Sequence, residues 1–148
     1  ERVLFRENFD FPRASRGHLY NVHLDLVGQG QPQGLLIGTG FKDKMKRIYE
    51  KYGRRPILIT EFAPADWEAH NLSQNRHKAP MVLAFMKEVL PWLERQDWVA
   101  GYAWFSFEHN EAVGHTSSLY DKNRNLTACG RYYRSITMEN PDGDQSIK

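Results

Sequence analysis

Three segments that read as strands alternate along this chain with segments that read as helices. The first strand is expected at residues 19–26, where apolar and polar side chains alternate with period two. The second, residues 56–62, is a short apolar run opened by a proline, which is typical of a strand buried on both faces of a parallel sheet. The third is expected at residues 98–107. Such an alternation indicates a parallel α/β protein with right-handed crossovers.

The segments between the strands have the spacing of helices. Residues 41–52 place apolar side chains on one helical face and charged ones on the other, and Gly53 ends the pattern. A second helix is expected from about His77 to Glu94, and a third begins near residue 126, with Thr127 as its cap. Either a doubly wound sheet or part of a TIM barrel fits this order, and periodicity alone does not choose between them.

Composition excludes several classes of protein. With 148 residues the chain suits one domain, expected at residues 1–138, followed by a polar tail at residues 139–148. No apolar run approaches the roughly 18 residues of a membrane span. The net charge is only +2, and basic and acidic residues are interspersed, so a nucleic-acid-binding face is not expected. The single cysteine, Cys129, excludes an internal disulfide.

Glu61 is the most informative residue, because it closes the apolar strand at the edge where α/β folds carry their catalytic side chains. The alternative is a structural carboxylate paired with an arginine or a backbone N–H. Trp104 holds the equivalent place on the next strand and suits the floor of a sugar site, or else the core. Trp67, in a polar loop after Glu61, is expected to face a ligand.

The remaining motifs indicate neither a metal nor a cofactor. The six histidines lack the spacing of metal ligands, although His23 could line a pocket. The chain has no P-loop, no GxSxG elbow and no GxGxxG sequence.

Three blocks of sequence resemble a known family. They are Tyr52–Ala63 (YGRRPILITEFA), Trp98–Ser106 (WVAGYAWFS), and Ser117–Asp121 with Leu126–Tyr133 (SSLYD and LTACGRYY). In this order they resemble glycoside hydrolase family 128, TIM-barrel β-1,3-glucanases that include fungal alkali-sensitive-linkage cell-wall proteins. The resemblance covers roughly residues 40–136 and implies an incomplete TIM-type parallel (β/α) barrel, of which this chain carries strands six to eight.

The resemblance also implies a function, namely the hydrolysis of β-1,3-glucan with retention. Glu61 then corresponds to the nucleophile, and Trp104 to the aromatic residue beside the reacting sugar. His23 falls near a histidine that ends the sixth strand, while Trp67 and Phe62 would grip glucosyl rings. An extracellular or cell-wall location is implied, and two N-glycosylation patterns, at Asn71 and Asn125, agree with it.

The chain departs from the family in one important respect. Retaining hydrolysis needs a second carboxyl group ~5–5.5 Å from the nucleophile, and the fourth-strand residue that supplies it in the family has no counterpart here. A complete barrel also takes about 200 residues or more. An incomplete barrel leaves a sheet edge that could associate with another copy or a partner. The alternative to an enzyme is therefore a non-catalytic glucan-binding or structural remnant of the same barrel; a third reading is an unrelated small α/β protein.

Overall fold

The computed structural model describes residues 20–26 and 34–138, and the predicted order of strands and helices is confirmed within them. The predicted tail at residues 139–148 lies outside the described residues. Two single turns of 3₁₀ helix, Leu72–Gln74 and His115–Ser117, interrupt the loops. The main elements are β1 (Tyr20–Leu26), α1 (Gly34–Lys51), β2 (Ile57–Pro64), α2 (Ala79–Glu94), β3 (Val99–Trp104) and α3 (Ala128–Met138).

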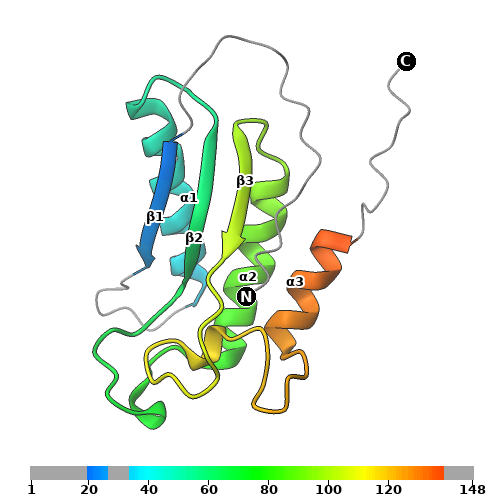
Figure 1. Ribbon diagram of the computed structural model, residues 1–148. Helices are drawn as coiled ribbons and strands as arrows, with labels where there is room; N and C mark the ends of the chain where they lie inside the picture. The colour runs from blue at the N-terminus through cyan, green and yellow to red at the C-terminus, as the bar shows by residue number, and fades with distance from the viewer. Residues whose placement is uncertain (1–19, 27–33, 139–148) are drawn as a thin grey trace.

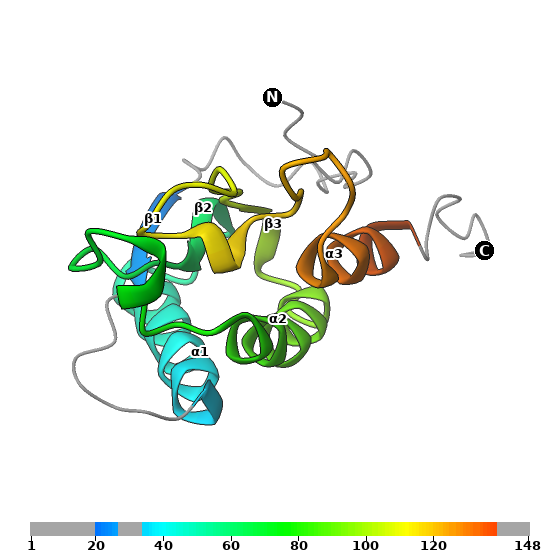
Figure 2. The same cartoon turned by 90° about the horizontal axis from the view of Figure 1, so that it is seen from below.

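The described strands form a parallel sheet in the order β1-β2-β3, the order of the sequence (Figure 1). Seen from below, the helices all lie on one side of this sheet (Figure 2). A doubly wound sheet reverses its strand order and carries helices on both faces. Strands that advance in one direction, with every helix outside, are the arrangement of a (β/α) barrel. The described fold is therefore TIM-barrel-like.

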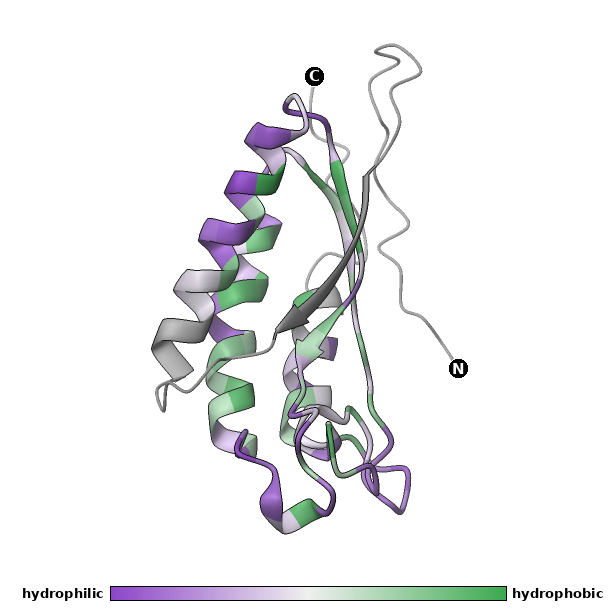
Figure 3. Ribbon diagram, turned by 90° about the vertical axis from the view of Figure 1, so that its left-hand side faces the viewer, coloured by the Kyte–Doolittle hydropathy of each residue, from purple (hydrophilic) through white to green (hydrophobic). Residues whose placement is uncertain are grey.

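The core lies between the sheet and the helices, and the hydrophobic residues of the helices lie on the side that faces the strands (Figure 3). Phe62 of β2 is at its centre, 1% exposed, with its ring centroid 5.3 Å from that of Phe41 and 5.3 Å from that of Trp104. Phe85 packs edge-on against Phe41 at 5.8 Å. Burial of these rings stabilises the packing of the helices against the sheet through the hydrophobic effect.

One irregularity in β2 determines which of its side chains reach this core. Between Ile59 and Phe62 the strand has one more residue than β3 opposite, and it has one more than β1 over almost the same stretch. This is a β-bulge around Thr60. Ile57, Ile59 and Phe62 are all fully buried, so the alternation that would otherwise place residue 61 in the core skips to residue 62.

Several boundaries differ from the sequence prediction. Helix α1 begins at Gly34, seven residues before the segment 41–52 that predicted it, whereas α2 begins two residues later than expected. Strand β3 ends at Trp104 instead of residue 107: the Phe105 N–H still donates to the Phe62 carbonyl of β2, and the chain then leaves the sheet. The predicted cap of α3 is confirmed, since the Thr127 hydroxyl accepts from the Gly130 N–H at 3.0 Å.

Candidate active site

Glu61 lies near the carboxyl end of β2 and is exposed. Because the bulge directs both of its core-facing neighbours, Ile59 and Phe62, toward the helices, Glu61 is left on the far face of the sheet, the face turned away from α1, α2 and α3. The backbone register places His23 of β1 directly beside it. The side chain of His23 lies outside what the structure describes.

Two long loops meet at this carboxyl edge of the sheet (Figure 1). Residues 65–78 connect β2 to α2, and residues 105–127 connect β3 to α3. The Asp66 N–H donates to the Val113 carbonyl at 2.7 Å, and the Ser117 hydroxyl donates to the Pro64 carbonyl at 2.6 Å. The first bond joins the two loops and the second joins the loop after β3 to the end of β2, so that the loops form a single layer below the strand ends.

Three aromatic rings gather in this layer, and we call Trp67, Phe105 and Phe107 the aromatic cluster. Trp67 is 55% exposed and Phe105 is 38% exposed, whereas Phe107 is buried between them. The ring centroids of Phe107 and Phe105 are 4.6 Å apart, and those of Phe107 and Trp67 are 6.2 Å apart. Exposed rings of this kind can stack against the C–H face of a sugar. Trp67 was predicted from the sequence, but Phe105 was not.

Two residues that the sequence suggested for substrate contact lie instead in the core. Phe62 is 1% exposed and Trp104 is 6% exposed. The Trp104 indole N–H donates to the Ser117 carbonyl at 2.9 Å, and its ring packs between Phe62 and Phe85. The physical reason is the bulge, which turns Phe62 inward and matches it with Trp104 across the sheet. In this structure neither ring has a face that a sugar could reach.

Asp66 is the most strongly bound carboxylate of the loop layer. Its side chain is only 1% exposed and accepts two hydrogen bonds from the Arg76 guanidinium, at 2.9 and 2.6 Å. It also accepts from the backbone N–H groups of Arg76 and Glu68. The Arg76 side chain, through these hydrogen bonds, holds the pKa of the Asp66 carboxyl well below its usual range. Asp66 therefore cannot hold a proton near neutral pH and is unsuited to act as a general acid.

The chemistry of other reactive groups is limited by burial. Burial raises the pKa of the Cys129 thiol to about 11, so the thiolate needed for nucleophilic attack is scarce at neutral pH. Within the part of the chain that the structure describes, no three histidine, cysteine or carboxylate side chains are grouped to hold a metal ion. The described helices also include none that is long and apolar enough to cross a bilayer.

Fold and site together define a TIM-barrel-like protein with an exposed carboxylate and exposed aromatic rings at the carboxyl edge of its strands. Residues 36–133 match the family model of the glycosyl hydrolase catalytic core, and the chain belongs to this family. The family resemblance drawn from the sequence is thereby confirmed. No match was found among curated protein sequences.

Two crystal structures share the fold. One is a family 128, subgroup V, exo-β-1,3-glucanase from Cryptococcus neoformans, with 24% sequence identity and a TM-score of 0.56 over 68% of this chain. The other is a family 128, subgroup VI, exo-β-1,3-glucanase from Aureobasidium namibiae, with 20% identity and a TM-score of 0.53 over 65% of this chain. The match spans 40% and 36%, respectively, of the length of those two chains.

Proposed function

We propose that this chain is the C-terminal part of a (β/α)-barrel glycoside hydrolase that cleaves β-1,3-glucan with retention, with Glu61 as the nucleophile. The observation that carries the proposal is the bulge in β2, which keeps a carboxylate exposed at the strand end where barrel enzymes do their chemistry. The likeness of the fold to two exo-β-1,3-glucanases supports the substrate class.

The chemistry takes place in two steps. The ionised Glu61 carboxylate attacks the anomeric carbon while a second carboxyl group protonates the departing glycosidic oxygen, giving a covalent glycosyl ester. The second group then removes a proton from water, which attacks the same carbon and releases Glu61. Asp66 is excluded from this second role by its pairing with Arg76. We propose that the acid/base comes from a segment other than the described strands.

Substrate binding is assigned to residues at the carboxyl edge of the strands, where Glu61 lies. Trp67 and Phe105 of the aromatic cluster offer exposed rings for glucosyl units, and His23 occupies the neighbouring backbone position on β1. Among the described residues β1 and β3 each pair on one side only, so the sheet can take further strands from the rest of a barrel, a second copy or a partner. We place the protein outside the cell or in the cell wall, where β-glucan occurs.

A second candidate is a glucan-binding protein without hydrolytic activity. The specific observation in its favour is the Asp66–Arg76 pair, because it removes from acid chemistry the carboxylate that follows Glu61 most closely in the sequence. An exposed aromatic cluster would serve such a protein equally well.

The experiment that tests the proposal is product analysis after incubation with a defined β-1,3-gluco-oligosaccharide. Glu61→Gln keeps the size of the side chain and removes its nucleophilic oxygen, so turnover should fall roughly a thousandfold or more while binding persists. Glu50→Gln is the matched control, since Glu50 pairs with Arg54 at 3.0 Å near the opposite end of β2. Proton NMR of the first products should show the β-anomer.

The outcomes separate the two candidates. Cleavage that Glu61→Gln removes and Glu50→Gln retains supports the hydrolase with Glu61 as nucleophile. Equal cleavage by the unaltered chain and Glu61→Gln would exclude Glu61 from that role. Binding without cleavage by any of the three proteins would mean either a glucan-binding protein or a catalytic domain whose acid/base lies outside this chain.

A further inference from the structure

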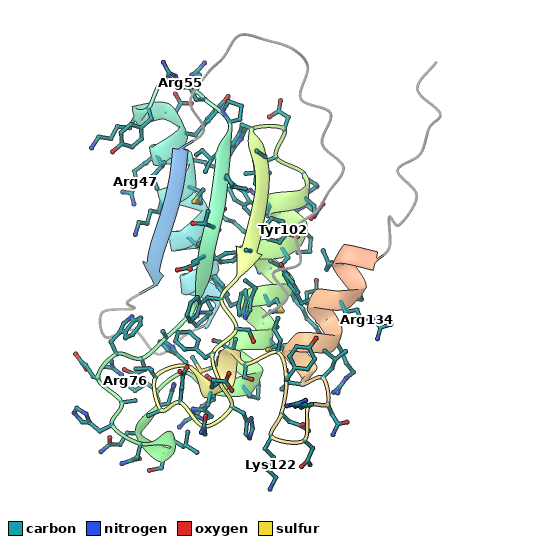
Figure 4. All side chains as sticks on the ribbon, viewed as in Figure 1. Arg47, Arg55, Arg76, Tyr102, Lys122 and Arg134 are labelled. Carbon is teal, nitrogen blue, oxygen red and sulfur yellow. The ribbon has the colours of Figure 1, made fainter. Side chains whose placement is uncertain are left out.

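The loop that carries Trp67 is closed on itself by an ion pair between a buried carboxylate and a half-exposed guanidinium. Asp66 immediately precedes Trp67, and Arg76 returns to it from ten residues further along, in the loop region below the strands (Figure 4). The guanidinium binds both carboxylate oxygens, and the Arg76 N–H adds a third bond at 2.8 Å. A two-pronged contact of this kind fixes direction as well as distance.

The closed loop is in turn bonded to the loop after β3. The Val113 carbonyl accepts from the Asp66 N–H at 2.7 Å and from the amide side chain of Asn75 at 3.0 Å. Gly114 follows, and it lies so close to Phe107 that a Cβ at this position would stand 2.0 Å from the ring. Phe107 contacts Trp67 edge-on. The chain of contacts therefore begins beside Trp67 and returns to its ring.

The buried Asp66 carboxylate has a cost in free energy and a consequence for Trp67. Burial removes water from a carboxylate, and an ion pair compensates for this loss only when its geometry is good. A buried ion pair is therefore not in itself evidence that the pair stabilises the fold. Trp67, however, is 55% exposed, so packing covers less than half of it. The orientation of an exposed ring depends on the backbone that carries it, and here that backbone is held at the adjacent residue, Asp66.

We propose that Asp66 is a positioning residue for glucan binding: its pairing with Arg76 holds the loop so that the exposed ring of Trp67 keeps one orientation beside Phe107 and can stack on a glucosyl unit. The inference rests on the proposed function, because it assigns to Asp66 a part in presenting Trp67 to the same glucan. Asp66 acts through Trp67 and does not itself touch the sugar.

The experiment follows the four tryptophan indole N–H signals by two-dimensional NMR during titration with a β-1,3-gluco-oligosaccharide. Trp67→Phe identifies the Trp67 signal. Asp66→Asn should move or broaden that signal, leave the signal of buried Trp104 in place, and weaken binding about tenfold, the scale of one aromatic contact. Arg76→Gln, at a half-exposed position, gives a second variant should Asp66→Asn fail to fold. Arg76→Lys keeps the charge but loses the bidentate contact, so it should weaken binding less than Arg76→Gln does.

A double-mutant cycle distinguishes positioning from a general structural role. With Trp67→Ala already present, Asp66→Asn should weaken binding no further. An equal loss from Asp66→Asn with and without Trp67 would overturn the inference, as would tenfold weaker binding in the Glu88→Gln control, which breaks the Lys42–Glu88 pair between α1 and α2. If Asp66→Asn leaves the sugar-induced shifts unchanged, the inference is overturned but the proposed function is not. No sugar-induced shift in the unaltered chain would overturn the proposed binding of glucan and the inference with it.

Discussion

The helix–sheet core and the loop layer of this protein are held together by different forces. The core, between the sheet and its helices, buries side chains that are almost entirely apolar. The buried polar residues found among the described positions all belong to the loop layer, residues 65–78 and 105–127: they are Asp66, Asn75, Ser117 and Ser118.

The difference matters because the two kinds of force have different requirements. Apolar burial is non-directional, so a core tolerates exchanges of similar volume. Buried hydrogen bonds need a specific partner at a specific distance, and a partner left unsatisfied is costly. A site that must hold exposed groups such as Trp67 in place cannot rely on packing, and hydrogen bonds replace it there.

The largest expected effect on stability is in the core. Phe85→Ala removes a ring that is 1% exposed and packs against Phe41 and Trp104, so it should lower the free energy of unfolding by about 3–5 kcal/mol. Urea unfolding followed by circular dichroism measures this loss. A change below about 1 kcal/mol would mean that the core around Phe85 rearranges easily and would contradict the difference between the core and the loop layer.

A smaller loss is expected in the loop layer. Asn75 is 1% exposed, donates to the Ala112 and Val113 carbonyls, and accepts from the His77 N–H at 2.8 Å. Asn75→Ala should therefore cost about 1–3 kcal/mol. Hydrogen exchange tests the difference between the two regions directly. In Asn75→Ala the amides of residues 65–78 should exchange faster, whereas those of β2 and α2 should keep their relative protection. Uniformly faster exchange through β2 would show that the two regions unfold as one unit.

Acid should weaken the loop layer in two stages. Partial burial lowers the pKa of His77 below its ordinary value of 6.5. The stability that its neutral ring provides above that pH therefore declines as the pH falls and the half-buried ring takes up a proton. The pKa of Asp66 is also lowered in the folded state, so its contribution persists above its ordinary value of 3.8 and declines only below it. Stability measured from pH 8 to pH 2 in Asp66→Asn should lack the second stage and keep the first.

Much of the fold could be predicted from the sequence because the spacing of apolar residues follows from their burial in the core. The apolar run of β2 and the helical spacing of α2 identify elements that the structure confirms, although β2 is fully buried on one face only as far as Ile59. Two boundaries were missed, because local propensity does not mark them. The glycines at the start of α1 disfavour a helix by intrinsic propensity, yet the helix forms there. Strand β3 ends after the pair of Trp104 with Phe62 of β2, although the sequence stays aromatic as far as Phe107.

The candidate site was predicted only where it follows from position in the fold. Glu61 at the end of an apolar strand and Trp67 in a polar loop are both exposed at the edge where they were expected. Phe62 could not be placed correctly, because no pattern in the sequence marks the bulge. The partnership of Asp66 with Arg76 joins two loop positions, and loops lack the periodicity that would have indicated it.

The bulge in β2 makes the facing of the site depend on one extra residue. Deletion of Thr60 would give regular alternation after Ile59, so Glu61 would still lie on the face turned away from the helices and Phe62 would still enter the aromatic core. A regular strand that kept Thr60 would instead exchange the two faces: the carboxylate of Glu61 would enter the core and the ring of Phe62 would face water. A homologue that lacks the extra residue would therefore present an acid at the same point in space from the position aligned with Glu61, without a bulge.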